Sequence, residues 1–259
     1  MARVIAFVSG KGGVGKTTTA VNVAQALFDS KKKVLLVDAN VTTPNVSLHY
    51  SINPGGFSLH EVLNGKIGIE QVIYKTETGL LVIPGGLNFD NLKTKIKKSL
   101  ASMLLSLMDK FDYIIIDAGA GLGMETQMAI RACEEVVLVT NPELPAITDA
   151  LRAKKLAEDL RVNLLGVVLN KKTGLDFDLK DQNIADFLEL PIIGDIPFDI
   201  NVSKSIKERI PVVTAYPLSK AAKAIKKLVN IITKEELYIQ DKPDNAFFKW
   251  IKKSLGLNQ

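Results

Sequence analysis

The sequence contains a single cysteine, Cys133, among its 259 residues. One thiol forms no internal disulfide bond and supplies no pair of thiolates for a zinc or iron–sulfur site. We therefore expect Cys133 to be a small core residue near the end of a helix. The two histidines, His49 and His60, have no acidic or cysteine neighbours at metal-ligand spacing. The sequence predicts surface or packing roles for both.

Long apolar runs are also absent. No stretch reaches the roughly 18 to 20 apolar residues that a membrane-spanning helix needs, and a glycine-rich motif follows the N-terminus too closely for a secretory signal peptide. We expect a cytoplasmic protein. Its 47% hydrophobic and 24% charged residues are typical of a globular enzyme. The net charge of +5 is compatible with nucleic acid or anionic lipid and selects neither.

The glycine-rich motif is G-K-G-G-V-G-K-T at residues 10–17, between an apolar run at 4–8 and a helical pattern over 16–30. Glycines let backbone N–H groups face phosphate oxygens, while the lysine and threonine supply a cation and a hydroxyl for Mg²⁺. The helix that follows adds the positive end of its dipole. A glycine-rich turn without nucleotide is the alternative, but it requires neither the Lys-Thr pair nor this context. The predicted phosphate-binding residues are Gly10, Lys11, Gly12, Gly13, Val14, Gly15, Lys16, Thr17 and Thr18.

Short apolar runs alternate with amphipathic helical patterns along the chain. Continuous apolar runs are typical of parallel strands covered on both faces. The pattern predicts an α/β fold of the P-loop NTPase type, with a doubly wound, mostly parallel sheet flanked by helices, in one domain over residues 1–233. The further predicted strands lie at 34–37, 80–83, 113–116, 136–139 and 164–169, and the helices at 97–110, 125–131, 145–160, 180–188, 201–209 and 217–232.

Two predicted strands end in aspartate, at Asp38 and Asp117. The carboxyl ends of such strands form the ligand-binding edge of the sheet. Asp117 is predicted to hold the water shell of Mg²⁺, with an aspartate that merely caps the next turn as the alternative. Asp38 and Thr17 are predicted on the metal side as well. Asn40 follows Asp38 closely; its amide can orient water but takes up no proton at neutral pH.

The motif beginning K-G-G-V-G-K-T-T at Lys11 resembles the deviant Walker A of the ParA/MinD superfamily, and the chain is most similar to its MinD-type members. The stretch D-A-N-V-T-T-P-N at 38–45 resembles archaeal members. The resemblance implies ATP and Mg²⁺ as ligands and a role for Lys11 across an ATP-dependent homodimer. Members usually carry aspartate where Asn40 stands, so we expect a slow ATPase whose catalytic residues are Lys11, Lys16, Asp38, Asn40 and Asp117. On the adenine side the resemblance implies Asn170, Pro197 and Asp199.

The C-terminal residues carry a second amphipathic pattern. Residues 234–244 are polar and typical of a linker. On a helical wheel, residues 245–257 gather aromatic and aliphatic side chains on one half and lysines on the other. This pattern favours a helix lying in an anionic membrane interface, as at the end of MinD proteins, while a helix docked on the protein body is the alternative. The predicted membrane residues are Phe247, Phe248, Trp250, Ile251, Leu255, Lys249, Lys252 and Lys253.

The resemblance implies an ATPase that cycles on and off the inner face of the cell membrane, where it positions the division site or another polar apparatus with an unidentified protein partner. A partition ATPase of the ParA type is one alternative. It would bind nucleic acid through basic runs at 93–98 and 220–227. The sequence favours this alternative less than a membrane-associated ATPase. An ATPase of metal-centre maturation or flagellar number is the other alternative, and the absence of a C-x-x-C motif disfavours it.

Overall fold

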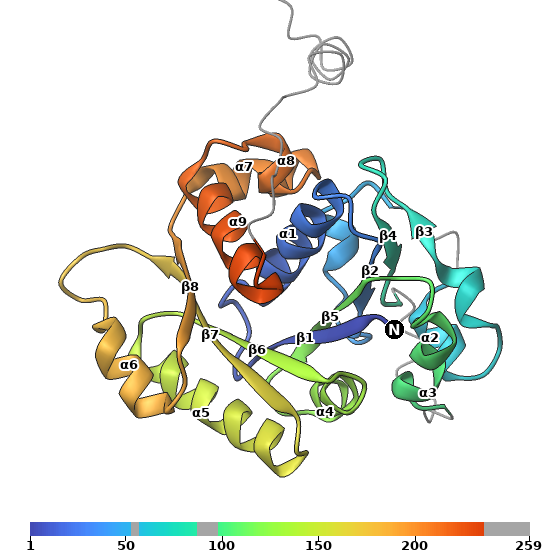
Figure 1. Ribbon diagram of the computed structural model, residues 1–259, viewed down its shortest axis with the longest axis horizontal. Helices are drawn as coiled ribbons and strands as arrows, with labels where there is room; N and C mark the ends of the chain where they lie inside the picture. The colour runs from blue at the N-terminus through green and yellow to red at the C-terminus, as the bar shows by residue number, and fades with distance from the viewer. Residues whose placement is uncertain (53–56, 87–97, 236–259) are drawn as a thin grey trace, which may run out of the picture.

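The computed structural model describes residues 1–52, 57–86 and 98–235 (Figure 1). Over these residues one sheet has the strand order β3-β4-β2-β5-β1-β6-β7-β8. Every neighbouring pair is parallel except β3 and β4. The strands are β1 (Arg3–Ser9), β2 (Val34–Asp38), β3 (Tyr74–Lys75), β4 (Leu81–Ile83), β5 (Tyr113–Ala120), β6 (Glu135–Thr140), β7 (Asn163–Lys172) and β8 (Ile192–Pro197).

Helices cover both faces of this sheet, so the predicted doubly wound fold is confirmed (Figure 1). One face packs against α1, α8 and α9, and the other against α2 to α6. The α-helices are α1 (Lys16–Asp29), α2 (Leu59–Leu63), α3 (Leu100–Leu104), α4 (Met124–Arg131), α5 (Leu144–Asp159), α6 (Asp181–Leu188), α7 (Ile200–Glu208), α8 (Val212–Ala215) and α9 (Lys220–Thr233), and short 3₁₀ turns lie at η1 (Val46–Leu48), η2 (Ile69–Val72) and η4 (Leu105–Leu107).

The central strands are apolar throughout because helices cover them on both sides. In β1, Ile5 and Phe7 face one half of the core while Ala6 and Val8 face the other, and all four are fully buried. A strand with two buried faces shows no alternation of polar and apolar residues. This is the physical reason that the six predicted strands are found in the structure.

The structure also differs from the sequence prediction. The helix expected at 97–110 is the short α3 followed by η4, and β3, β8, α2 and α8 were not predicted. In β8 the apolar run is interrupted by Gly194, where a Cβ atom would lie 3.1 Å from a methyl carbon of Leu228 on α9. The linker and the amphipathic helix predicted at 234–257 lie, apart from residues 234 and 235, outside the described residues.

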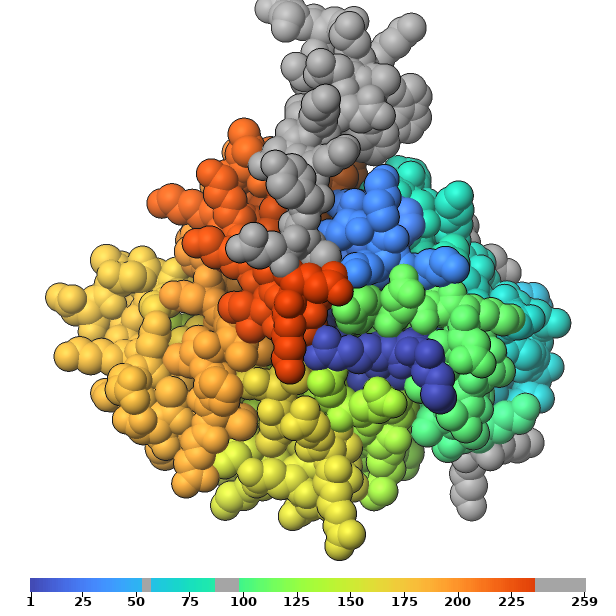
Figure 2. All heavy atoms as spheres, viewed as in Figure 1, coloured from blue at the N-terminus to red at the C-terminus, as the bar shows by residue number. Residues whose placement is uncertain are grey.

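The end of α9 is fixed to the start of the sheet. The guanidinium of Arg3 donates to Glu135 Oε2 at 2.6 Å and to the carbonyl oxygen of Ile232 at 2.6 Å. Figure 2 shows this end of α9 beside the first residues of the chain. Among the described residues, no helix has both the length and the apolar character needed to cross a membrane.

A close backbone approach at Gly166 supplies a test of the packing of β7. Gly166 has φ +147°, and a Cβ there would lie 2.5 Å from the carbonyl oxygen of Pro191. We expect Gly166→Ala to lower the free energy of unfolding by about 1–3 kcal/mol, measured by urea denaturation. Gly68→Ala is the control, because a Cβ at Gly68 meets no atom within 4 Å. Equal stability of both variants would contradict the expectation.

Candidate nucleotide-binding site

The glycine-rich loop joins β1 to α1, and its backbone conformation depends on glycine. Gly13 and Gly15 have φ +82° and +92°, which is the left-handed region that favours glycine. A Cβ at Gly15 would lie 2.0 Å from the side-chain nitrogen of Asn170, and one at Gly10 would lie 2.0 Å from the carbonyl oxygen of Asp149 on α5. Gly10 therefore allows α5 to approach the loop closely, a packing role that the sequence did not predict.

Side chains from the ends of β6 and β7 hold the loop. The amide nitrogen of Asn170 donates to the carbonyl oxygen of Val14 at 2.8 Å, and Lys171 Nζ donates to that of Gly13 at 2.7 Å. Asn141 Nδ2 donates to the carbonyl oxygen of Asn170 at 2.8 Å. The sequence predicts that Asn170 contacts adenine. In the structure its side-chain nitrogen is hydrogen-bonded to the glycine-rich loop. Asn141 was missed; its place directly after an apolar strand was the available signal.

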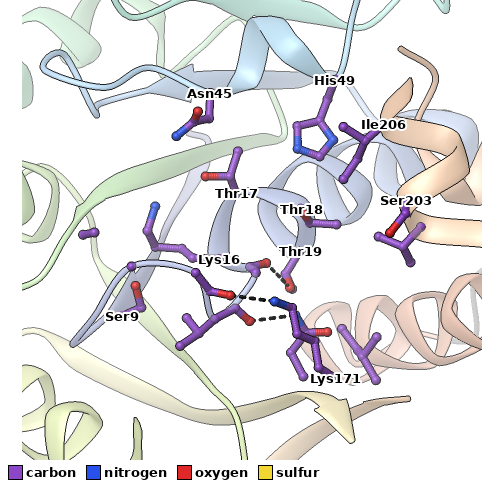
Figure 3. A pocket seen from close by; sticks show the side chains of 18 of the residues that line it. Ser9, Lys16, Thr17, Thr18, Thr19, Asn45, His49, Lys171, Ser203 and Ile206 are labelled. Carbon is purple, nitrogen blue, oxygen red and sulfur yellow. Dashed lines mark hydrogen bonds between the residues drawn. The ribbon is translucent and has the colours of Figure 1, made fainter. Parts of the chain in front are cut away.

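A cleft of about 480 Å³ opens above the loop (Figure 3). Its other walls come from the segment after β2 and from the β8–α7 connection and α7. Thr43, Asn45 and His49 line the first of these, and Val202 and Ser203 belong to α7. The structure brings together most predicted site residues as lining of this cleft, namely Lys11, Gly12, Gly13, Val14, Gly15, Lys16, Thr17, Thr18, Asn40, Asn170, Pro197 and Asp199.

Beneath the loop, Lys16 and Asp117 form a buried ion pair. Lys16 Nζ lies 2.6 Å from Asp117 Oδ1, and it also donates to the carbonyl oxygen of Ala118. Lys16 is 6% exposed and Asp117 is fully buried. The second carboxylate oxygen of Asp117, Oδ2, is buried and has no hydrogen-bond partner in the described structure. A buried, unpaired carboxylate oxygen is unusual and fits a site that a cation or its water shell completes.

Asp38 lies directly across from Asp117 in the β2–β5 pairing. Its carboxylate accepts the backbone N–H groups of Asn40, Asn45 and Val46 at 3.0–3.1 Å. Burial, followed by the neighbouring charge of Asp117, raises the pKa of Asp38 to about 7. Two adjacent buried carboxylates repel each other, and the single ammonium of Lys16 balances only one of the two charges. This arrangement fits a divalent cation.

The donor set near these carboxylates favours Mg²⁺ over zinc. The described residues contain no group of three or more His, Cys, Asp or Glu side chains that could hold a metal ion. Mg²⁺ keeps several waters and is held by one or two carboxylates together with substrate phosphates. Thr17, which lines the cleft at the start of α1, supplies the hydroxyl that such a site uses.

The side chain of Asn40 is engaged within its own turn. Its Nδ2 donates to the carbonyl oxygen of Thr43 at 2.6 Å, and its Oδ1 accepts from the backbone N–H and the hydroxyl of Thr43 at 3.2 and 3.1 Å. Asn40 lines the cleft but stabilises the loop that follows β2. An aspartate there would lose the donor to Thr43, so the amide also has a structural role.

Two loops that border the cleft are tied together. Glu125 Oε1, in the first turn of α4, accepts from the backbone N–H and the hydroxyl of Thr42, both at 2.6 Å. The next residue, Thr126, donates to the carbonyl oxygen of Gly119 near the end of β5. The segment following β2 and the end of β5 are therefore joined through α4. No local pattern in the sequence indicates this role of Glu125.

The lysine at the mouth of the cleft is partly exposed. Lys11 Nζ lies 3.8 Å from Glu143 Oε2 at the start of α5, and its side chain is 34% exposed. Such an exposed pair contributes little to stability, so it restrains the Lys11 side chain only weakly.

Asp199, predicted on the adenine side, caps two helices. Its carboxylate accepts from the backbone N–H of Asn201 at 2.9 Å and from that of Ala221, at the start of α9, at 3.1 Å. Burial opposes ionisation, but these N–H groups outweigh it and the pKa of Asp199 is lowered. Asp199 lines the cleft while its carboxylate is committed to α7 and α9.

The two histidines and the cysteine are at least partly buried. His49 and His60 are both buried, and His60 Nε2 lies 2.8 Å from Asn64 Nδ2 within α2 and its cap. The predicted packing role is thus confirmed for His60. His49, by contrast, lines the cleft. Cys133 follows the end of α4 and packs against the core, as expected, and burial raises the pKa of its thiol to about 12.

A family model described as an AAA domain matches residues 2–161, and a second model of that description matches residues 123–206. An uncharacterised ATP-binding protein of Methanocaldococcus jannaschii is 35% identical over 99% of this chain and 98% of its own length. The septum site-determining protein MinD of Synechocystis is 33% identical over 85% of each chain. The antiactivator FleN of Pseudomonas aeruginosa is 32% identical over 86% of this chain and 84% of its own.

The chain belongs to the MinD/ParA family of P-loop ATPases. The solved structure of the cell division ATPase MinD of Pyrococcus furiosus superposes with a TM-score of 0.85 at 38% identity, covering 90% of this chain and 99% of that one. MinD of Pyrococcus horikoshii, solved with Mg-ADP, gives 0.86 at 33% identity, covering 93% and 100%. The family resemblance predicted from the sequence is confirmed, and the archaeal similarity is consistent with it.

The double cap of Asp199 yields a stability prediction. Asp199→Ala removes both accepted hydrogen bonds, so we expect the free energy of unfolding at pH 7 to fall by about 1–2 kcal/mol, measured by urea denaturation. Asp199→Asn keeps an acceptor and should lose less.

The contribution of Asp199 should also depend on pH. Its pKa is lower in the folded protein than the ordinary value of 3.8, so the stabilisation is complete above that value and is lost as pH falls through the lower folded pKa. The difference in stability between the wild type and Asp199→Asn should therefore narrow below about pH 4. A constant difference down to pH 2 would contradict this explanation.

Proposed function

We propose that the chain binds ATP with Mg²⁺ in the cleft, hydrolyses it slowly, dimerises while ATP is bound, and in that form attaches to an anionic membrane surface where it positions other proteins. The observation that carries the ATP and Mg²⁺ part is the unpaired Asp117 Oδ2 beside Lys16 and Asp38, below a glycine-rich loop. The Mg-ADP complex of the Pyrococcus horikoshii relative supports the same ligands.

In this proposal different residues bind the phosphates and the Mg²⁺ ion. The N–H groups of the loop and of the first turn of α1 face anionic oxygens. To reach a phosphate, the Lys16 ammonium exchanges its contacts with Asp117 and Ala118 for contacts with the ligand, so the lysine remains paired in both states. Mg²⁺, when bound, neutralises charge on the phosphates. Thr17, Asp38 and Asp117 are the residues that would hold it and its waters.

Slow turnover follows from Asn40. Phosphoryl transfer depends mainly on positioning and on charge stabilisation, so an amide in place of a carboxylate should reduce the rate without abolishing it. The amide is also occupied by Thr43, which limits its freedom to orient an attacking water. We infer a long-lived ATP-bound form, which suits a positional switch.

Dimerisation and membrane attachment are linked in this proposal. Lys11 lies at the mouth of the cleft and is weakly restrained, so it is available to contact the nucleotide of a second protomer. A single short amphipathic segment at 245–257 is marginal as a helix in water. Two segments in one dimer make the second insertion intramolecular, which can raise membrane avidity by about 10²-fold or more. Hydrolysis that separates the protomers would then release the membrane.

The role of Asn40 can be tested by Asn40→Asp. The carboxylate can still accept from Thr43 N–H, and it adds a charge that polarises water, so we expect steady-state ATP hydrolysis to rise about tenfold. Ser47→Asp, which places a charge on neighbouring η1 outside the cleft, serves as the control and should leave the rate unchanged. An unchanged or lower rate for Asn40→Asp would count against the proposal.

Membrane cycling can be tested by co-sedimentation with liposomes containing phosphatidylglycerol, with ATP, ADP or no nucleotide. We expect binding of the full chain only with ATP, and loss of binding both in a chain ending at Asp244 and in full-length Ile251→Glu, which places a charge on the apolar face. Liposome binding that is the same with and without ATP, or that is retained in the chain ending at Asp244, would contradict the proposal. Salt-sensitive DNA binding without liposome binding would favour the partition alternative instead.

A further inference from the structure

His49 is a buried polar residue whose side chain makes no hydrogen bond within the described part of the chain. It ends η1 and is 6% exposed. Its imidazole lines the cleft and makes no hydrogen bond with any residue that the structure describes. Its ring nitrogens are not among the fully buried, unpaired atoms of the described residues, so they open onto the cleft and are available to a ligand there. His60, by contrast, is paired within α2.

The charge state of His49 limits which ligand group it suits. Burial lowers the pKa of His49 to about 4, although the negative charge of Asp117 acts in the opposite direction. The imidazole is therefore neutral at pH 7, with one nitrogen that donates and one that accepts. A phosphate oxygen only accepts, and the loop and Lys16 already serve that part of the ligand. A hydroxyl group both donates and accepts, which matches a neutral imidazole.

The position of His49 fits the middle of a nucleotide. Figure 3 shows His49, Ile206 and Ser203 along the wall beyond Thr17 and Thr18, on the side away from Lys16. In the proposed function the phosphates lie at Lys16, Thr17 and Thr18, and the base lies at the β8–α7 connection with Pro197. The sugar joins these two parts of the nucleotide, so it lies along the wall that continues from Pro197 through α7 toward His49.

The helix α7 supplies the rest of this wall. Ser203 is exposed, lines the cleft and makes no hydrogen bond within the described residues, so its hydroxyl is available as a second polar group. Val202 and Ile206 line the cleft on the same helix. An apolar surface with a few polar groups is typical of a wall that packs against sugar carbons.

We infer that His49, with Ser203 farther along the same wall, forms a subsite for the ribose hydroxyls of the bound nucleotide and makes the cleft selective for ribonucleotides. The inference rests on the proposed function, because it requires a nucleotide in the cleft. It assigns His49 a positioning and specificity role in binding, with no part in the chemical step.

Isothermal titration calorimetry with ATP, 2′-deoxyATP and 3′-deoxyATP in the presence of Mg²⁺ tests the inference. We expect the wild type to bind at least one deoxy analogue about three- to tenfold more weakly than ATP, which is the effect of one hydrogen bond. His49→Phe should weaken ATP binding by a similar factor and leave the binding of that analogue unchanged, so that discrimination disappears. His49→Gln, which keeps a neutral donor and acceptor, should retain part of the discrimination, and Ser203→Ala should reduce it. Ser47→Ala, on η1 but outside the cleft, should preserve it.

Equal affinity of the wild type for all three nucleotides would overturn the inference and leave the proposed function intact. Discrimination that persists in both His49→Phe and Ser203→Ala would overturn it as well. No binding of ATP by the wild type would instead overturn the proposed function. Because Ser203 lies at the surface, its variant tests the subsite even where a change at buried His49 disturbs the fold.

Discussion

The buried pair of Lys16 and Asp117 is the interaction on which the cleft depends. It places a positive charge next to two carboxylates that face each other across β2 and β5. Removing one partner of such a pair typically destabilises a protein by about 3–5 kcal/mol, because the other charge is left buried alone. The same ammonium is the group that a phosphate would attract. In the proposed function, ligand binding would therefore exchange one anionic partner of Lys16, the carboxylate of Asp117, for another, a phosphate.

The segments around this pair are coupled by hydrogen bonds. Asn40 fixes the turn after β2 through Thr43, and Thr42 is bound to Glu125 on α4. A change in the position of Asp38 or Asp117 would therefore reach the surface of α4 through a short chain of contacts. This link is a physical route between the cleft and an outer surface.

Local signals in the sequence were sufficient for the centre of the fold and for the loop. Strands such as β1 are apolar on both faces, and the spacing of Gly13, Gly15 and Lys16 specifies the loop conformation within a few residues. The edge strands escaped prediction because β3 has only two residues and β8 contains a glycine and a proline.

The walls of the cleft depend on contacts between distant residues. Asn170 and Val14 are 156 positions apart, and the cap that Asp199 places on α9 spans 22 positions. Nothing in the local pattern shows that these side chains are committed to the backbone. For the same reason the sequence predicted only a surface or packing role for His49, since the cleft wall combines η1 with the distant helix α7.

The bond from Arg3 to the carbonyl oxygen of Ile232 fixes the end of α9 at one edge of the sheet. Helix α9 begins beside Asp199 at the nucleotide edge and ends beside the first residue of β1. Seven strand residues, or about 20 Å, separate that end from the loop. The last described residues after Thr233 therefore lie at the edge of the sheet opposite the cleft. In the proposed switch, a membrane attached to the segment beyond them would lie behind the sheet and leave the mouth of the cleft open.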